Sequence, residues 1–467
     1  MLRSILDGRA RHENPNTLRF TLLACLVTLV TATQGATYDY IVVGAGIAGA
    51  GAASTLKKNG ESSVIVLEGR DRLGGRLYSE KVGGYTVNLG ASWVHGLRGN
   101  PLVSLAKQAG VALSKERSDY EDTKTYYASG KPVPTGAEAS YDATWEKFEK
   151  YLEARQDEAD YDYDDDPGLG PVVDAFVRKK RLTGTEREAF IFNVKVNIED
   201  EYAADYPQLS LWYDDDASLR GGDKLVTGPY DGLVTYLLRG IEVVLDSPVE
   251  RIDYAGSFSS GVSVNANGKE YVARKGVIVT VPLGVLKARS IKFVPDLPKK
   301  NRNAIAALGM GVLNKCVLVF DSIWWDQEEW IQQIADNFQA NLNLAPVSGE
   351  PILYGFNSGD TAKEIERWSD AKTCDTLMAA LRRMYPDAPK TYRHCVVTRW
   401  SEDPFSKGSY SYTTPRMEYR PAHKGVGAAV AGGRVSFAGE ACSLNSPGTV
   451  HGAYSTGVEA AKRLLDQ

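Results

Sequence analysis

Residues 38–49 read YDYIVVGAGIAG, and this stretch decides the fold. Its β-branched and aromatic residues end at Gly44, and the glycines then follow the spacing GxGxxG. Small residues with helical character continue as far as Gly60. The pattern predicts a buried strand, a tight turn and a helix. In such a unit Gly44 permits the turn, Gly46 lets the backbone approach a pyrophosphate, and Gly49 allows the helix to pack closely on the strand.

A second strand and an acidic residue complete the unit. Residues 63–67 read SVIVL, and Glu68 follows them directly. A carboxylate at this position can accept a hydrogen bond from a ribose hydroxyl. The glycine spacing alone is a weak signal, but strand, helix, second strand and acidic residue together predict a Rossmann-type dinucleotide site.

The composition is that of a globular protein. The chain has 467 residues, of which 43% are hydrophobic and 24% charged, so it is long enough for two or three domains. Its formal net charge of −5 provides no basic field for a phosphate backbone, and we expect no nucleic-acid partner. One acidic cluster predicts a solvated loop or helix end, or alternatively a patch that attracts a cationic substrate. It consists of Glu153, Asp157, Glu158, Asp160, Asp162, Asp164, Asp165 and Asp166.

The first 36 residues are predicted to be a signal peptide or targeting segment. An apolar run at 20–30 follows four arginines and leads to small residues at a plausible cleavage site. The run is shorter than the roughly 20 residues of a membrane span, so we expect no stable span in the mature chain. The sequence favours secretion, and a membrane anchor or an organellar transit peptide is the alternative. The residues concerned are Arg3, Arg9, Arg11, Arg19, Thr33, Gly35 and Ala36.

The cysteines follow no metal-binding pattern. Cys316, Cys374, Cys395 and Cys442 are scattered without CxxC or histidine at ligand spacing, and Cys25 falls in the presumed signal. We therefore expect no metal site. The four scattered cysteines could pair in a secreted protein or remain buried thiols, and the apolar strand around Cys316 favours a thiol there.

Several further motifs carry a resemblance to a known family. Glu68 is followed by GRDRLGGRLYS, which offers a second close backbone approach at Gly75 and a guanidinium at Arg76. The sequence resembles the flavin-containing amine oxidases, in particular the branch of polyamine oxidases and lysine-specific histone demethylases. It lacks the helical tower and preceding helical module of the demethylases, so we expect no chromatin role. The landmarks are LGASWVHG (89–96), SPVERIDY (247–254), VTVPLGVLKARSIKFVPDLP (279–298), LGMGVLNKCVLVFDSIWW (308–325), RWSEDPFSKGSYSY (399–412) and FAGEACSLNSPGTVHGAYSTG (437–457).

The resemblance implies an α/β architecture in which two domains are interleaved. A Rossmann-type FAD-binding domain would comprise residues 38–115, 215–295 and 396–467. A mixed α+β substrate-binding domain would comprise residues 116–214 and 296–395. Periodicity alone does not predict this interleaving.

The resemblance also implies FAD as the cofactor and assigns residues to it. Glu440 would meet the ribityl or pyrophosphate region, and Trp400 would pack beside the isoalloxazine. The helix expected at 450–465 would point its N-terminus toward the flavin. The implied cofactor-binding residues are Gly44, Gly46, Gly49, Glu68, Arg70, Gly75, Arg76, Val249, Trp400, Glu440, Thr449 and Val450.

The reaction implied by the resemblance is oxidation of an amine. Flavin N5 takes a hydride from the carbon beside the nitrogen, water hydrolyses the imine to an aminoaldehyde and a smaller amine, and dioxygen is reduced to hydrogen peroxide. Lys315, in LNKCVLVF, matches the family's lysine that holds a water against N5 and assists reoxidation. His95, in SWVHG, matches a histidine that contacts an inner polyamine nitrogen. Lys315 and His95 are therefore the expected catalytic residues.

The expected substrate is spermine, spermidine or a relative. Tyr410 matches the aromatic residue on one side of the family's substrate, and an aromatic face suits methylenes and charged amine ends. Thr449 stands where monoamine oxidases place a second aromatic residue, which argues for a longer, narrower tunnel. His95, Tyr410 and Thr449 are the expected substrate-binding residues. His95 favours the back-conversion type of polyamine oxidase over the terminal-catabolism type.

Two other functions share parts of this pattern. An L-amino acid oxidase would carry the same cofactor motifs but needs an arginine that clamps the substrate carboxylate. A flavin-binding protein without amine turnover is the alternative from another class. The expected partners are a small polyamine and dioxygen, and we expect a monomer or a weak homo-oligomer.

Overall fold

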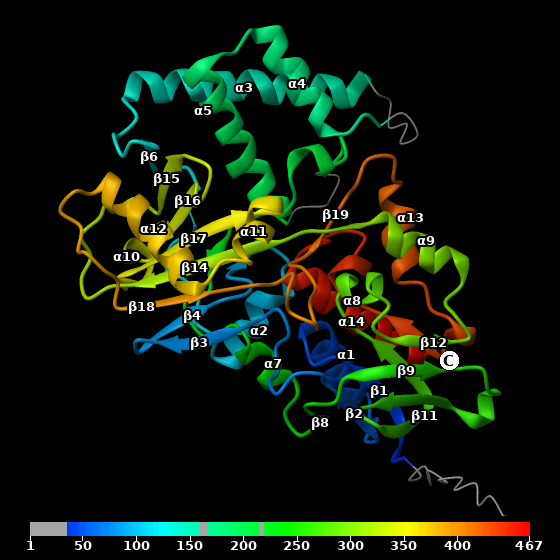
Figure 1. Cartoon of the computed structure of the whole chain (residues 1–467). Helices are drawn as coiled ribbons and strands as arrows, with labels where there is room; N and C mark the ends of the chain where they lie inside the picture. The colour runs from blue at the N-terminus through cyan, green and yellow to red at the C-terminus, as the bar shows by residue number, and fades with distance from the viewer. Residues whose placement is uncertain (1–34, 119, 159–165, 214–218) are drawn as a thin grey trace, which may run out of the picture.

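Two large sheets and a helical layer form the body of the protein, as described by the computed structural model for residues 35–118, 120–158, 166–213 and 219–467 (Figure 1). The predicted signal segment lies outside these ranges, apart from Gly35 and Ala36. Within them, no helix is both long and apolar enough to cross a membrane.

The predicted strand, glycine turn, helix and second strand are confirmed. β1 (Thr37–Val43) leads into α1 (Ile47–Lys58) and then into β2 (Val64–Leu67). β1 and β2 are parallel, with Val43 opposite Leu67. The carboxyl ends of both strands therefore meet at one edge of the sheet, where the glycine turn and Glu68 also lie.

The first sheet contains eight strands among the described residues, with β1 between β11 and β2. The path runs β12-β9-β10-β11-β1-β2-β8, and β20 pairs with β11. The further strands are β8 (Glu242–Val244), β9 (Val249–Asp253), β10 (Val262–Ala266), β11 (Lys269–Val279), β12 (Lys292–Val294) and β20 (Val435–Phe437).

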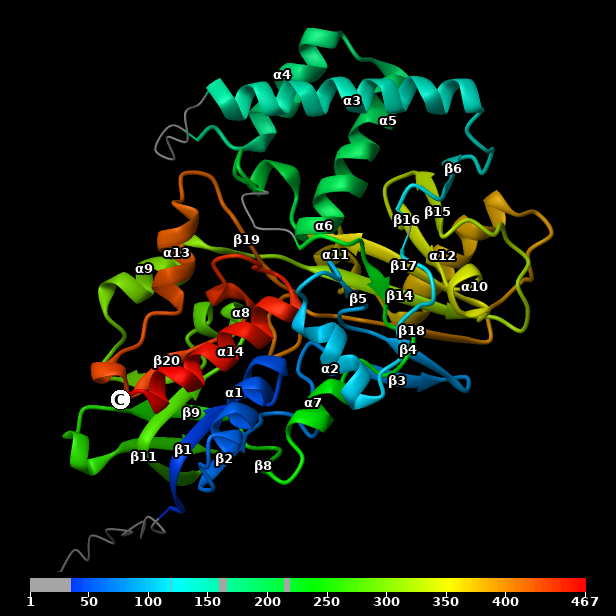
Figure 2. The same cartoon turned by 180° about the vertical axis from the view of Figure 1, so that it is seen from behind.

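α14 (Val450–Leu465) returns from the end of the chain and packs along α1 (Figure 2). The two helices approach closely because glycines line their contact. A Cβ atom on Gly457 would lie 2.0 Å from the carbonyl oxygen of Ala48. This contact lays the middle of α14 on the first turn of α1, and the helix that the sequence predicted at residues 450–465 is confirmed.

The second sheet contains six strands in the described part of the chain, in the order β18-β14-β17-β16-β15-β6. All of its neighbours are antiparallel except β15 and β6, which run parallel. The strands are β6 (Thr123–Tyr127), β14 (Leu313–Val319), β15 (Trp330–Ile334), β16 (Ala340–Asn343), β17 (Ile352–Ser358) and β18 (His394–Val397).

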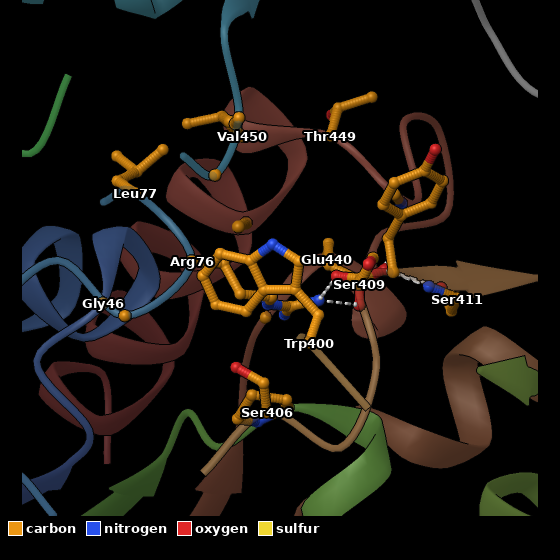
Figure 3. Close-up of a pocket in the computed structure, with 18 of the residues that line it drawn as sticks. Gly46, Arg76, Leu77, Trp400, Ser406, Ser409, Ser411, Glu440, Thr449 and Val450 are labelled. Carbon is orange, nitrogen blue, oxygen red and sulfur yellow. Dashed lines mark hydrogen bonds and ion pairs between the residues drawn. The ribbon is translucent and has the colours of Figure 1, made fainter. Parts of the chain in front are cut away.

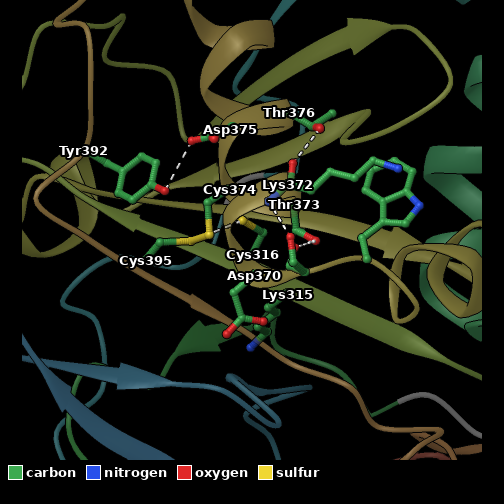
Figure 4. Close-up of a disulfide and its surroundings, with 12 residues drawn as sticks. Lys315, Cys316, Asp370, Lys372, Thr373, Cys374, Asp375, Thr376, Tyr392 and Cys395 are labelled. Atoms are coloured by element: carbon green, nitrogen blue, oxygen red, sulfur yellow. Dashed lines mark hydrogen bonds between the residues drawn. A yellow bond between two sulfur atoms is a disulfide. The ribbon is translucent and has the colours of Figure 1, made fainter.

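A disulfide joins α12 (Asp370–Met384) to β18 through Cys374 and Cys395 (Figure 4). Cys316 is a buried free thiol whose sulfur lies 3.8 Å from that of Cys395. Burial raises the pKa of the Cys316 thiol far above its ordinary value, so it is protonated at neutral pH. Cys442 is also free. The sequence left pairing open, and the structure contains one disulfide and two thiols among these four cysteines.

A helical layer stands beyond the second sheet, at the top of Figure 1. It consists of α3 (Thr135–Glu158), α4 (Leu169–Lys180) and α5 (Gly184–Val194). Phe148, Phe176 and Phe190 form its core, with ring centroids 5.1–5.2 Å apart. A π-helical turn at Lys195–Glu199 then leads into α6 (Asp200–Tyr202).

One part of the acidic-cluster prediction is wrong. Asp166 is only 1% exposed, so it belongs neither to a solvated loop nor to a surface patch. Its carboxylate accepts hydrogen bonds from the Ser210 hydroxyl at 2.7 Å and from the backbone of Gly168 and Leu211. These bonds compensate for the burial of the charge. Glu153, Asp157 and Glu158 lie at the end of α3, and residues 159–165 lie outside the described ranges.

Shorter elements connect these layers. In the described ranges, the remaining α-helices are α2 (Pro101–Ala109), α7 (Gly232–Leu237), α8 (Leu283–Lys287), α9 (Lys299–Ala307), α10 (Ala345–Ser348), α11 (Gly359–Ile365) and α13 (Tyr419–Val426). The remaining strands are β3 (Ser79–Val82), β4 (Tyr85–Asn88), β5 (Trp93–Val94), β7 (Lys224–Leu225), β13 (Gly309–Met310) and β19 (Ser411–Tyr412). The domain boundaries given above stay a prediction.

Candidate active site

A cavity of about 790 Å³ is lined by residues from both sheets. Its lining extends from the turn after β1 to β14 and to the start of α14. This volume lies within the range of ligand and cofactor sites. Every residue assigned to the site from the sequence lines the cavity except Gly49. Those lining it are Gly44, Gly46, Glu68, Arg70, Gly75, Arg76, His95, Val249, Lys315, Trp400, Tyr410, Glu440, Thr449 and Val450.

The three glycines of the turn have different surroundings. Gly44 has a φ of +103°, which side chains disfavour. A Cβ atom on Gly49 would lie 1.9 Å from the carbonyl oxygen of Gly44, so Gly49 is where α1 packs on the turn. A Cβ atom on Gly46 would have no neighbour closer than 3.8 Å, because Gly46 faces the cavity. This open space beside the first turn of α1 suits a phosphate.

Glu68 joins the ends of β1 and β2. Its carboxylate is 4% exposed and accepts hydrogen bonds from the backbone N–H groups of Ala45, at 2.7 Å, and Arg70, at 2.9 Å. The guanidinium of Arg70 in turn binds the Asp403 carboxylate at 2.6 Å and the Ser406 hydroxyl at 2.9 Å. Glu68 therefore fixes the turn, and Arg70 fixes the loop that precedes β19.

The partly exposed guanidinium of Arg76 and the buried carboxylate of Glu440 form an ion pair at the wall of the cavity (Figure 3). Burial pushes the pKa of Glu440 upward, but Arg76, the Ser411 hydroxyl and the Gly448 N–H outweigh it and hold the pKa below its ordinary value. The Ser411 hydroxyl donates to Glu440 at 2.6 Å. Arg76 also donates to the Ser409 carbonyl at 2.6 Å. The carboxylate is thus ionised and tied to three chain segments.

Trp400 lies between Arg76 and the loop at Ser406 in Figure 3. Its indole lines the cavity and is mostly buried, and its backbone N–H donates to the Asn314 amide oxygen at 3.0 Å. Asn314 donates in turn to the buried carboxylate of Glu366 at 2.7 Å. This chain of hydrogen bonds holds the backbone of Trp400 against β14.

Lys315 extends from β14 into the cavity wall and is 4% exposed. Its amine donates to the Asn88 carbonyl at 2.8 Å, the Gly90 carbonyl at 2.6 Å and the Ser92 hydroxyl at 2.5 Å. None of these partners is charged, and burial lowers the pKa of Lys315 to about 7. The amine can therefore take up or release a proton near neutral pH, which suits a residue that exchanges protons.

His95 lies at the cavity wall, and its ring Nδ1 is 2.8 Å from a carboxylate oxygen of Asp223. The same carboxylate accepts from the Gly96 N–H at 2.8 Å and from the Tyr120 hydroxyl at 3.0 Å. Burial alone would raise the pKa of Asp223. Its contacts with His95, Gly96 and Tyr120 outweigh burial, so the pKa lies below its ordinary value. Asp223 is therefore ionised at neutral pH.

Tyr410 and Thr449 lie on neighbouring segments of the wall, since a Cβ atom on Gly448 would be 3.5 Å from the Tyr410 ring. The Tyr410 hydroxyl donates to the Asp200 carbonyl at 3.1 Å, and its burial raises the pKa of the phenol well above the ordinary value. Thr449 is the N-cap of α14, and its hydroxyl accepts from the Gly452 N–H at 3.0 Å. Thr449 thus has a structural role as the N-cap, and its contact with cofactor and substrate stays a prediction.

Several lining residues were not identified from the sequence. Asp223 meets His95, and Tyr120 meets Asp223, only in the folded chain, and no local pattern marks either residue. Trp330 and Phe356 extend the aromatic wall from Trp93, with Trp330 stacked on Trp93 at 6.1 Å. The carboxylates of Asp200 and Glu201 also line the cavity. The acidic sequence NIEDEY was the one available signal for them.

The residues present fit a dinucleotide. Gly46 leaves open space at the start of α1, and Thr449 and Val450 bring the N-terminus of α14 to the same cavity. Backbone N–H groups at helix N-termini favour phosphate. Val249, in the first sheet, lines the same cavity. Its lining also includes Trp400, Lys315, Trp330 and Phe356.

Comparison with known proteins agrees with this geometry. The profile of the family described as flavin containing amine oxidoreductase matches residues 47–465. Polyamine oxidase 4 of Oryza sativa subsp. japonica is 34% identical over 444 residues, which cover 91% of this chain and 89% of that protein. Polyamine oxidase 2 of Arabidopsis thaliana is 34% identical over 441 residues, with 90% and 87% coverage.

Two other comparisons extend these. Lysine-specific histone demethylase 1 homolog 2 of Arabidopsis thaliana is 33% identical over 92% of this chain, but the match covers only 59% of that longer protein. A solved structure of a putrescine oxidase double mutant superposes with a TM-score of 0.73 and 19% identity, covering 92% of this chain and all of that one. The structural likeness confirms the predicted fold.

Proposed function

We propose that polyamines of the spermine and spermidine class are the substrates of this chain, which belongs to the family of flavin-containing amine oxidoreductases. The chain is an FAD-dependent amine oxidase. Its relatives named polyamine oxidases match it over nine tenths of its length. The choice of polyamines over other amines depends on the cavity.

The observation that carries the proposal is the composition of the cavity wall beyond Lys315. Trp93, Trp330 and Phe356 form an apolar aromatic face, and the carboxylates of Asp223 and Glu201 lie on the same cavity. An aromatic face packs against methylenes and attracts charged ammonium groups. Carboxylates attract the remaining positive charges. A flexible chain of methylenes with two or more amines matches this pattern.

The arginines of the cavity argue against an amino acid as substrate. Arg70 and Arg76 are the arginines that line it among the described residues, and each is already bound to a carboxylate, Asp403 and Glu440 respectively. A substrate carboxylate would need an arginine that is available for a bidentate contact. We therefore favour a cationic substrate without a carboxylate.

The chemistry requires a neutral amine at the reacting carbon. FAD, when bound, accepts the electrons removed from that carbon and delivers them to dioxygen, which becomes hydrogen peroxide. An alkylamine with a pKa of about 10.4 needs roughly 4 to 5 kcal/mol to lose its proton at pH 7. Exclusion of water around the reacting nitrogen lowers this cost, because desolvation disfavours the cation. Lys315, with a pKa near 7, is suited to exchange a proton beside the reacting groups.

His95 supports the back-conversion mode of cleavage. Contact between its ring and an inner nitrogen would place the carbon on the outer side of that nitrogen at the reaction centre. Spermidine would then yield putrescine and 3-aminopropanal, and spermine would yield spermidine. Chromatography of spermidine products tests this point, because 1,3-diaminopropane as the main amine would contradict it.

Secretion remains part of the proposal. The N-terminal segment supports it, and the Cys374–Cys395 disulfide is consistent with an oxidising compartment. The test is expression of the full chain in a eukaryotic host, followed by fractionation and N-terminal sequencing. Protein in the medium that begins near residue 37 would support secretion, whereas an intact N-terminus inside the cell would contradict it.

Release of hydrogen peroxide tests the substrate class. Purified protein is mixed with spermine, spermidine, benzylamine and L-leucine at equal concentrations in air. We expect turnover of the polyamines with kcat/KM at least 100-fold above that of the other two. Faster turnover of L-leucine would support the amino acid oxidase instead, and no turnover of any amine would leave a flavin-binding protein.

A further inference from the structure

We propose that Asp223 is a positioning residue that fixes the ring and the tautomer of His95 for binding a polyamine nitrogen. The inference rests on the proposed function, because it concerns the substrate contact of the same cavity. It adds a residue that no sequence pattern indicated, since Asp223 lies 128 positions from His95.

Two hydrogen bonds besides the one to His95 hold the Asp223 carboxylate in place. One oxygen of its carboxylate accepts from the Gly96 N–H at 2.8 Å, and the other accepts from the Tyr120 hydroxyl at 3.0 Å. The residue adjoins β7, which pairs with β5 immediately before His95. The carboxylate is thus anchored to the backbone of the same loop whose histidine it binds, so the distance between ring and carboxylate is well determined.

The contact also determines the protonation pattern of the ring. The carboxylate of Asp223 is ionised and can only accept, so Nδ1 of His95 must carry the proton in their 2.8 Å contact. In a neutral ring, Nε2 is then unprotonated and can accept a hydrogen bond from a protonated amine. The opposite tautomer would present an N–H to the substrate and repel an ammonium group.

The aromatic wall limits the ring from one side. The ring of His95 stacks on Trp93 with centroids 6.4 Å apart, and Trp93 in turn stacks on Trp330. Trp93 and Asp223 therefore contact the same imidazole, one through its face and the other through Nδ1. Loss of the carboxylate would leave the stack but release the hydrogen bond that selects the tautomer.

A double-mutant cycle tests whether Asp223 acts through His95. The variants are Asp223→Asn, His95→Ala and the double variant, each measured for FAD content and for kcat/KM with spermidine. Asp223→Asn should lower kcat/KM about tenfold, as expected for loss of a charge-assisted hydrogen bond. The double variant should be no worse than His95→Ala within twofold. Two losses that multiply would contradict the inference, because Asp223 would then contact the substrate independently.

A net-charge control accompanies the cycle. Asp296→Asn removes a carboxylate that is 69% exposed and pairs with Arg302 outside the cavity. It should leave kcat/KM within twofold of the original protein. A tenfold loss in this control would mean that overall charge, and not the position of His95, explains the effect of Asp223→Asn, and the inference would fail.

NMR tests the tautomer without any substrate. The sequence contains five histidines, so ¹⁵N-histidine labelling gives a small set of ring signals, and His95→Ala identifies the signal of His95. We expect Nδ1 of His95 to carry the proton in the FAD-bound protein, and this state to be lost or reduced in Asp223→Asn. A proton on Nε2 alone would overturn the inference. This result is independent of polyamine turnover, so failure of the proposed function and failure of the inference are distinguishable.

Discussion

The guanidinium of Arg76 lies 2.9 Å from the carboxylate of Glu440, although 364 positions separate the two residues in the sequence. One belongs to the loop after β2 and the other to the turn after β20. Their contact links the N-terminal Rossmann unit to the segment that leads into α14. The ion pair therefore joins the first and last parts of the chain at the cofactor cavity.

Arg76→Ala should destabilise the protein and weaken FAD binding. It leaves the 4% exposed carboxylate of Glu440 without its cation, and breaking a buried pair in this way costs about 3 kcal/mol. Thermal unfolding and the ratio of flavin to protein absorbance measure the two effects. Arg463→Ala is the matched control, because Arg463 forms an exposed pair with Glu459 on α14. Its unfolding free energy should change by less than about 0.5 kcal/mol. Equal effects of the two variants would contradict this account.

Two glycine substitutions should separate folding from cofactor binding. Gly49→Ala places a methyl group 1.9 Å from the Gly44 carbonyl, so it should prevent α1 from packing and yield little soluble protein. Gly46→Ala meets no atom closer than 3.8 Å and has a backbone φ of −79°, which alanine accepts. We expect it to fold, with a circular dichroism spectrum like that of the original, but to purify with much less FAD. Full FAD occupancy in Gly46→Ala would show that this face does not contact the cofactor.

Lys315→Met should separate the two halves of the catalytic cycle. The substitution keeps most of the length and apolar packing of the side chain but removes the amine that can carry a proton. We expect the variant to bind FAD and to be reduced by spermidine without oxygen, but to be reoxidised by dioxygen at least tenfold more slowly. Stopped-flow absorbance measures both steps. An unchanged reoxidation rate would assign Lys315 a structural role only.

The difference in stability between this variant and the original protein should depend on pH in a defined direction. The pKa of Lys315 is about 7 in the folded chain and ordinary, near 10.4, when unfolded. Between these values the unfolded chain binds the extra proton, so stability of the original protein rises with pH. Lys315→Met lacks this dependence. Its stability advantage should thus be largest below pH 7 and diminish toward pH 10, and an advantage that grows with pH would contradict the lowered pKa.

Thr449→Phe should change which amines are accepted. It introduces an aromatic ring where monoamine oxidases carry one, so the ratio of benzylamine to spermidine turnover should rise at least tenfold. The variant also loses the hydroxyl that accepts from Gly452, and the loss of an N-cap costs about 1 kcal/mol. Thr449→Ala loses the same cap without adding a ring and is the matched control for that loss. An unchanged ratio would indicate that position 449 does not limit the substrate.

The sequence predicted the elements whose pattern is local. The glycine turn, β1, β2, Glu68 and the helix at 450–465 each carry a periodic or spaced signal within a few residues. The interleaved domains came only from resemblance, because no local signal reports which distant strands share a sheet. For the same reason the sequence does not predict Asp223, because its role depends on a contact with His95, which is distant in the sequence.

Burial is the other property that the sequence did not reveal. Asp166 belongs to a run of acidic residues and was expected to be solvated, yet its carboxylate is enclosed by donors from the chain. Lys315 stands at the start of an apolar strand, but only the fold shows that the three hydrogen-bond partners of its amine are uncharged. A run of charged residues in a sequence suggests an exposed segment. The hydrogen-bond partners that permit burial of one of its charges lie on other segments of the chain, so the run itself does not reveal them.

Anaerobic reduction of the bound flavin tests the central claim most directly. The purified protein is mixed without oxygen with spermidine, spermine, benzylamine or L-leucine, and the oxidised flavin band is followed. The account predicts rapid bleaching with spermidine and spermine, little change with benzylamine or L-leucine, and return of the band with formation of hydrogen peroxide when air is admitted. A flavin that L-leucine bleaches, or that remains oxidised with every polyamine, would contradict it.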